Sequence, residues 1–156
     1  MPEKYRPMTI STRNEPRVFS TDELKFRANS PKSRSARAVT EETTGATKIL
    51  SGVFFSEPGS EGGWSFGDSD PHVERAPWVG AGEEVYFCIQ GRVEVEWEGG
   101  SFEFGAGDIV FWPNNSWFRT RIIGDEPAQI FYCMAPPPTH MWSLGGSVTK
   151  AGKPDK

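Results

Sequence analysis

Histidine, cysteine and long apolar runs are scarce in this sequence, and each shortage argues against a class of protein. The 156 residues include two histidines and two cysteines, Cys88 and Cys133. The cysteines form no C-x-x-C pair, which argues against a zinc ribbon or a dithiol redox motif. We expect two free, buried thiols, with a disulfide between them as the alternative. No apolar run approaches the roughly 20 residues that span a bilayer, and residues 1–10 lack the apolar core of a secretory signal. We therefore expect a cytoplasmic protein without membrane contacts.

Acidic residues outnumber basic ones overall, but the first 40 residues are basic. The formal net charge is -4, while residues 1–40 carry nine Lys or Arg against four Asp or Glu. These basic residues are scattered, and no nucleic-acid recognition motif accompanies them. We expect the basic segment to lie on the acidic body of its own chain or of a second subunit, and we expect no nucleic-acid partner.

Three regions differ in their patterns: 1–46, 47–142 and 143–156. The segment "FSTDELKF" (19–26) predicts a short helix capped by Ser20 and Glu23, within an extended N-terminal arm. Polar residues 28–46 predict a surface connection, and the Gly- and Lys-rich end predicts a frayed tail. From residue 47, short apolar or alternating runs are separated by turn signals every 8–12 residues, which is typical of an all-β sandwich or barrel.

Two motifs inside the β-rich region have a specific spacing. Glu84 is followed after six residues by Gly91, and Gly107 is followed after five by Pro113. Glycine tolerates the positive φ that tight turns often require, and proline ends ladder pairing. Taken together and in this order, the motifs resemble those of the cupin superfamily, and most of all the branch that contains the ethanolamine-utilisation cupin. The resemblance implies a double-stranded β-helix, or jelly-roll, barrel over about residues 47–142, preceded here by the arm and one short helix.

The positions that bind metal in the metal-binding cupins carry other residue types in this chain. Such cupins carry a His-x-His pair three or four residues before the Glu, where this chain has Trp78 and Gly80, or Pro77 and Val79. They carry another histidine five residues after the Pro, where this chain has Phe118. A lone Glu84 does not hold a transition metal, so we expect no cofactor. An atypical divalent transition-metal site built from His72 and Glu84 remains an open alternative.

Residues at alternate positions of a strand share one face, so Glu84, Tyr86 and Cys88 are expected to point the same way. The resemblance implies that this face lines the barrel, together with Trp78 and Phe118. Further candidates for the pocket wall are Tyr132, Trp64 and Phe55. The alternative is that these rings form ordinary core, and that arginines such as Arg92, Arg119 or Arg121 pair with Glu84.

Three functions follow as hypotheses. The first is a metal-independent enzyme, a lyase or isomerase that dehydrates, cyclises or tautomerises a small, partly aromatic or carbonyl-bearing metabolite. Glu84 would be its general acid or base and Tyr86 its hydrogen-bond donor. The second is a non-catalytic binding or accessory cupin, and the third is the metal enzyme with His72 and Glu84. Small cupins are usually dimers, so a homodimer is expected in each case.

Overall fold

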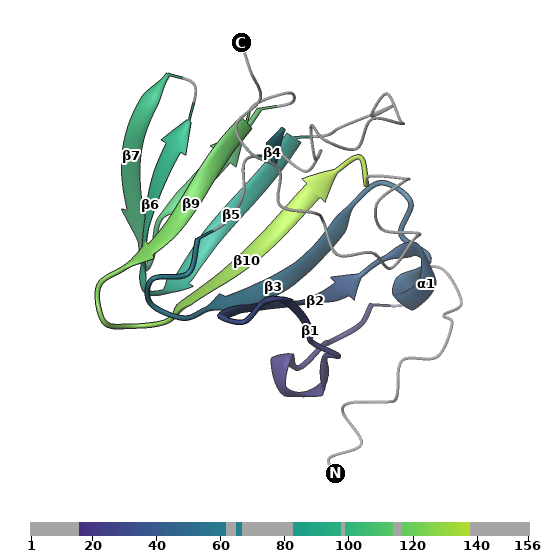
Figure 1. The fold of residues 1–156 in the computed structure, drawn as a ribbon. Coiled ribbons are helices and arrows are strands. Elements are labelled where there is room, and N and C mark those ends of the chain that lie inside the picture. Colours follow the sequence, from purple (N-terminus) through teal and green to yellow (C-terminus); the bar gives the residue numbers. More distant parts are fainter. Residues whose placement is uncertain (1–15, 62–64, 67–82, 98, 114–116, 138–156) are drawn as a thin grey trace.

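The computed structural model describes residues 16–61, 65–66, 83–97, 99–113 and 117–137, and all that follows concerns these residues. They form two short helical turns and ten strands (Figure 1). The elements in chain order are η1 (Thr21–Glu23), β1 (Arg27–Ser30), β2 (Ser33–Val39), α1 (Glu41–Thr44), β3 (Leu50–Ser56), β4 (Ser65–Phe66), β5 (Glu83–Gln90), β6 (Arg92–Trp97), β7 (Gly100–Gly105), β8 (Ile109–Trp112), β9 (Trp117–Ile123) and β10 (Ala128–Ala135).

The strands form two antiparallel sheets that pack face to face. The larger sheet has the order β1-β2-β3-β10-β5-β8, and the smaller has the order β4-β9-β6-β7. One apolar cluster joins them, since Ile130 and Val110 come from the larger sheet while Val93, Val95 and Ile122 come from the smaller. This arrangement confirms the predicted all-β jelly-roll barrel. In the described part of the chain, no helix is long and apolar enough to cross a membrane.

Glycines make the two turns that the sequence motifs predict. Gly91 has φ 86° between β5 and β6, and Gly107 has φ 92° between β7 and β8. A Cβ on Gly91 would lie 2.7 Å from the Ala128 Cα, so this turn also packs too closely for a side chain. Asp108 accepts a hydrogen bond from the backbone N–H of Gly105 at 2.8 Å, as expected for a turn aspartate. These two turns fix how β5 leads into the smaller sheet and how β8 returns to the larger one.

The N-terminal segment differs from its prediction in two ways. Residues 28–46 are not a surface connection, because β1 and β2 extend the larger sheet beside β3. The short helix predicted over 19–26 is a single 3-10 turn, and Ser20 makes no side-chain capping bond. A complete capping box instead starts α1, where Thr40 and Thr43 exchange hydrogen bonds. Apolar side chains of residues 19–26 pack over the outer face of β2 and β3.

Candidate functional site

Strand β5 places one carboxyl group inside the barrel. Glu84 is 3% exposed, and Cys88 is completely buried. Tyr86 between them packs against the central clusters. The intervening Val85 and Phe87 are exposed on the other face. The predicted alternation of this strand is therefore confirmed, and Glu84 lies where charge is costly unless it is compensated.

The register of the larger sheet sets the neighbours of Glu84 and Tyr86. Glu84 lies opposite Trp112 of β8 on one side and Met134 of β10 on the other. Tyr86 lies opposite Tyr132, which is itself buried. Cross-strand partners on one face have Cβ atoms about 4.5–5.5 Å apart. A carboxyl group and two phenols thus share one end of the barrel interior.

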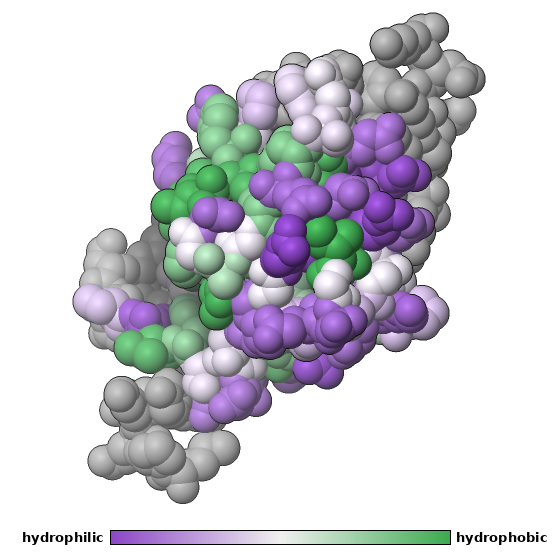
Figure 2. All heavy atoms as spheres, turned by 90° about the vertical axis from the view of Figure 1, so that its left-hand side faces the viewer, coloured by the Kyte–Doolittle hydropathy of each residue, from purple (hydrophilic) through white to green (hydrophobic). Residues whose placement is uncertain are grey.

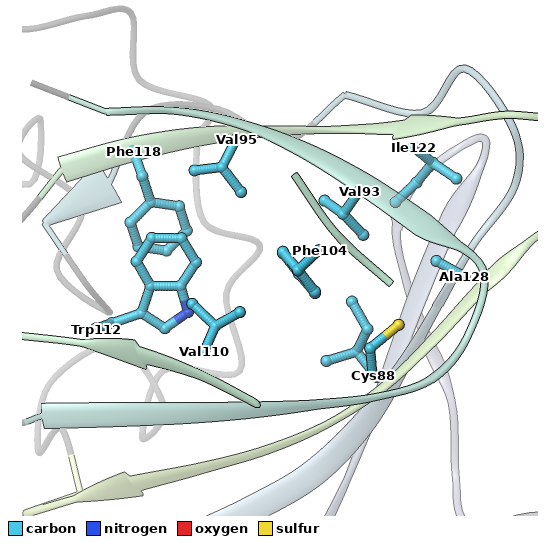
Figure 3. Close-up of a cluster of buried hydrophobic side chains, with 10 residues drawn as sticks. Cys88, Val93, Val95, Phe104, Val110, Trp112, Phe118, Ile122 and Ala128 are labelled. Carbon is cyan, nitrogen blue, oxygen red and sulfur yellow. The ribbon is translucent and has the colours of Figure 1, made fainter. Parts of the chain in front are cut away.

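Aromatic rings surround this end. The rings of Trp112 and Phe118 are stacked, with centroids 3.8 Å apart and planes at 13°. Tyr86 meets Trp112 edge-on at 5.5 Å and Phe54 at 5.4 Å, while Phe54 lies 6.2 Å from Tyr132. Figure 3 shows Trp112 and Phe118 together at one end of the interior cluster. Phe118, at the position where the metal-binding cupins that the motifs resemble carry a ligand histidine, is therefore packed against another ring.

Cys88 lies at the opposite end of the same cluster (Figure 3), near Ala128 and Ile122. Its thiol donates to the carbonyl oxygens of Gln90 at 3.3 Å and Gly91 at 3.6 Å. Burial raises the pKa of this thiol. Both Cys88 and Cys133 are free, as expected, but only Cys88 is buried, and Cys133 is partly exposed. The structure thus places Cys88 in apolar core beside the Gly91 turn, away from Glu84. The prediction that Cys88 lines a pocket together with Glu84 is therefore corrected.

Phe55 is another candidate that lies away from Glu84. It belongs to the outer face of the larger sheet, where its ring centroid is 5.4 Å from that of Phe26 and the guanidinium of Arg34 lies over it. Its neighbour Phe54 points inward instead, because its register partner on β10 is the buried Ile130. The prediction of Phe55 as pocket wall is corrected to Phe54.

Three other predicted residues, His72, Trp64 and Trp78, lie outside the described residues. Within the described residues, no group of three or more His, Cys, Asp or Glu could hold a metal ion. Among the described residues, the side chains around Glu84 are aromatic rings, a thioether and phenols, which do not by themselves form a donor set for a divalent transition metal.

The arginines considered as partners of Glu84 lie on the other side of the smaller sheet. Arg119 pairs with Glu96 at 2.8 Å, Arg121 pairs with Glu94 at 2.6 Å, and Arg92 pairs with Glu103. The register that sets Glu94 opposite Arg121 and Glu96 opposite Arg119 also turns all these side chains outward. Figure 2 views this side of the molecule, where hydrophilic side chains gather beside hydrophobic ones. Glu94 and Glu96 therefore lie on a solvated face of β6.

Besides Phe54, sequence reasoning missed two further residues of this interior. Trp112 stacks on Phe118, although an aromatic run such as "IVFWP" gives no sign of which ring points inward. Arg37 of β2 lies opposite Gly52, in the same row of the sheet as Tyr132 and Tyr86. Its signal is the alternation in "SRSARAV", where Ala36 is buried on the outer face and Arg37 takes the inner one.

The fold and the interior together define a small double-stranded β-helix protein with a polar, aromatic-walled end. Residues 71–134 match the family model described as a Cupin domain. This match covers 64 of the 156 residues, so over this segment the chain is similar to the cupin superfamily.

Individual relatives are distant. An uncharacterised protein of Methanocaldococcus jannaschii is 31% identical over 58 residues, which cover 37% of this chain and 46% of that protein. The match thus spans less than half the length of this relative. The cupin domain of Schizosaccharomyces pombe Cnp3 superposes with a TM-score of 0.58 at 14% identity, covering 84% of this chain and 75% of that one. The polyketide cyclase RemF of Streptomyces resistomycificus gives 0.62 at 11% identity, with 80% and 82% coverage. At these identities the structural matches describe the fold alone.

Proposed function

We propose that this chain is a metal-independent small-molecule cupin that uses Glu84 as a general acid or base. The observation that carries the proposal is a carboxyl group buried inside the barrel beside Tyr86 and within a wall of aromatic rings. Apolar walls with a few placed polar groups are typical of small-molecule sites. A carboxyl held away from water can take or give a proton at a carbon next to a carbonyl.

The reaction class that fits these groups is proton transfer: dehydration, cyclisation or tautomerisation of a small, partly aromatic or carbonyl-bearing metabolite. Glu84 moves the proton, and the Tyr86 hydroxyl donates a hydrogen bond to the oxygen on which negative charge develops. The rings of Phe118 and Phe54 exclude water from the reacting atoms. The fold of RemF, a polyketide cyclase, makes cyclisation one member of this class, as an analogy at the level of fold only.

A cytoplasmic setting is part of the proposal. Cys88 and Cys133 are free thiols, and free thiols suit a reducing compartment.

Metal analysis tests the metal independence of the proposed enzyme. A zinc, iron or manganese ion at molar equivalence in protein purified without chelators would overturn metal independence. Its loss in His72→Ala would then favour the metal site of His72 and Glu84.

Hydrogen exchange tests the proton-transfer role directly. The wild type and Glu84→Gln are incubated in D2O with a set of small aryl ketones and β-keto acids, and deuterium uptake next to the carbonyl is followed by NMR. We expect Glu84→Gln to slow the uptake at least about 100-fold, the usual scale for a general acid or base. Glu83→Gln is the matched control, because Glu83 is the preceding residue of β5 and is exposed on the opposite face. Equal rates in wild type and Glu84→Gln would refute the role.

A non-catalytic binding cupin is the second candidate. The observation in its favour is the close stack of Trp112 on Phe118, which fills the position where other cupins hold a ligand histidine. In that case, members of the compound set bind to the wild type and shift its melting temperature, but none shows deuterium uptake above the buffer rate.

A further inference from the structure

The N-terminal strands bring two guanidinium groups to the inner face of the larger sheet. Arg27 of β1 lies opposite Ser35 of β2, and Ser35 lies opposite the inward-pointing Phe54 of β3. Arg37 is two residues beyond Ser35 and therefore shares its face. Neither arginine falls within the segment that matches the Cupin domain. The first two strands thus add charge to an interior that is otherwise aromatic and phenolic.

Gly52 leaves the space into which this charge can reach. A Cβ on Gly52 would lie 2.7 Å from the Tyr132 hydroxyl and 2.1 Å from the Ala36 carbonyl oxygen. Arg37 and Tyr132 flank Gly52 from the two neighbouring strands. The Nη2 atom of Arg37 and the hydroxyl of Tyr132 are both buried. Because Gly52 has no side chain, the guanidinium of Arg37 and the hydroxyl of Tyr132 can approach each other over β3.

The electrostatics of Arg37 agree with this placement. Burial lowers the pKa of its guanidinium, and so does Arg27, while Tyr132 and Glu42 act in the opposite direction. Arginine nevertheless stays protonated at any physiological pH. Two guanidinium groups on one half-buried face can both contribute to binding an anion, and the planar fork of arginine matches a carboxylate through two parallel hydrogen bonds.

We propose that Arg37, supported by Arg27 and the Tyr132 hydroxyl, binds the carboxylate of an anionic small molecule whose other end lies against Tyr86 and Glu84. This inference rests on the proposed small-molecule site, since both share the row Arg37–Gly52–Tyr132–Tyr86. Arg37 and Tyr86 are three strands apart, roughly 14 Å between their backbones. Side chains fill part of that distance, so the ligand class is a carboxylic acid of about one ring.

A purely structural role for Arg37 makes a different prediction. An arginine that only holds the sheet to Glu42 at α1 stabilises the protein, but it does not distinguish a charged ligand from a neutral one of the same shape. Benzoate and benzamide form such a pair of probes, because both are planar and of equal size while one carries a carboxylate.

Isothermal titration calorimetry with the full chain separates the two roles. For the wild type we expect benzoate to bind at least about 10-fold more tightly than benzamide, and Arg37→Met to abolish this preference by weakening benzoate binding far more than benzamide binding. Arg92→Met is the matched control, since Arg92 lies on the solvated outer face in an ion pair with Glu103, and it should keep the preference. Circular dichroism melts of each variant establish that it is folded.

The outcomes also separate this inference from the proposed function. A benzoate preference that survives in Arg37→Met, equal binding of both probes to the wild type, or no benzoate binding at about 10 mM each overturns the carboxylate site. A preference that depends on Arg37, together with deuterium uptake that does not depend on Glu84, keeps the carboxylate site and refutes the catalytic role. Inorganic phosphate binding as tightly as benzoate would overturn the carboxylate as the ligand class.

Discussion

The thiol of Cys88 shows what burial does to a single titratable group. It lies in the apolar end of the barrel and donates to two turn carbonyl oxygens, and burial raises its pKa above the ordinary value of 9.0. A nearby Asp108 acts in the same direction, while the hydrogen bond to Gln90 opposes it. A buried neutral thiol is therefore a structural, chemically inert group in this barrel.

The raised pKa predicts how the stabilising contribution of Cys88 changes with pH. Below pH 9 the thiol is protonated in both the folded and unfolded states, so its contribution is complete. Above pH 9 the unfolded thiol ionises while the folded thiol keeps its proton, so unfolding becomes easier. We expect the difference in free energy of unfolding between wild type and Cys88→Ala to shrink from pH 8 to pH 10, as measured by urea titration. A difference that stays constant or grows would contradict this.

At the scale of elements, the segment before β1 acts as a cover for the larger sheet. Leu24 is 9% exposed and packs with Ala36 of β2 and Val53 of β3, and Phe26 meets Phe55 in the same cluster. The outer face of β2 and β3 is thus buried by a segment with little regular structure of its own. Its contribution to stability comes from apolar contact rather than from backbone pairing.

Leu24→Ala tests this cover. Truncation of a leucine this deeply buried costs about 2–3 kcal/mol in free energy of unfolding, through lost transfer energy and the remaining cavity. Val18→Ala, at a neighbouring side chain that is 62% exposed, is the control and should cost well under 1 kcal/mol. Urea unfolding followed by tryptophan fluorescence measures both. Equal costs for the two variants would show that the segment does not cover the sheet.

The elements that the sequence could predict are those whose side chains alternate. Strand β6 shows this, with Val93 and Val95 buried and Glu94 and Glu96 turned outward. The turn at Gly91 was equally predictable, because only its backbone conformation was needed. Strand β2 was missed because its outer face carries mainly alanines, and the larger apolar side chains that cover it come from residues 19–26.

The candidate site divides in the same way. Glu84, Tyr86 and Tyr132 were predictable as inward-facing because their own strands alternate. The adjacent phenylalanines of β3 carry no alternation of their own, and only pairing with β10 decides which of them points inward. Arg37 depends on two such steps, since β2 is placed by β3 and β3 by β10. Long-range register of this kind is absent from any local pattern.

At the scale of the whole molecule, one large face of the barrel is apolar and exposed. It is the outer face of β10, β5 and β8, where the register places Phe131 beside Phe87, Phe87 beside Ile109, and Val85 beside Phe111. The three phenylalanines are 37%, 41% and 56% exposed. With aromatic side chains of about 150–250 Å² each, they expose roughly 200–330 Å². The aliphatic side chains of this face add a comparable area.

An apolar face of this size is at the upper end of what monomers expose, and it amounts to a large part of the roughly 800 Å² that each partner contributes to a standard interface. We propose that a second copy of this chain covers it, related by a twofold axis. Strand β8 lies at the edge of the larger sheet, so its backbone can also pair across the interface.

Light scattering coupled to size-exclusion chromatography tests this dimer. We expect the wild type to elute at twice the mass of the 17.3 kDa chain. Phe87→Glu should give a monomer, because each copy would bury an unpaired carboxylate against the apolar face of its partner at the centre of the interface. Val18→Glu, also at an exposed apolar side chain but before η1, should leave the dimer intact. A monomeric wild type, or a dimer that survives Phe87→Glu with unchanged circular dichroism, would exclude this face as the interface.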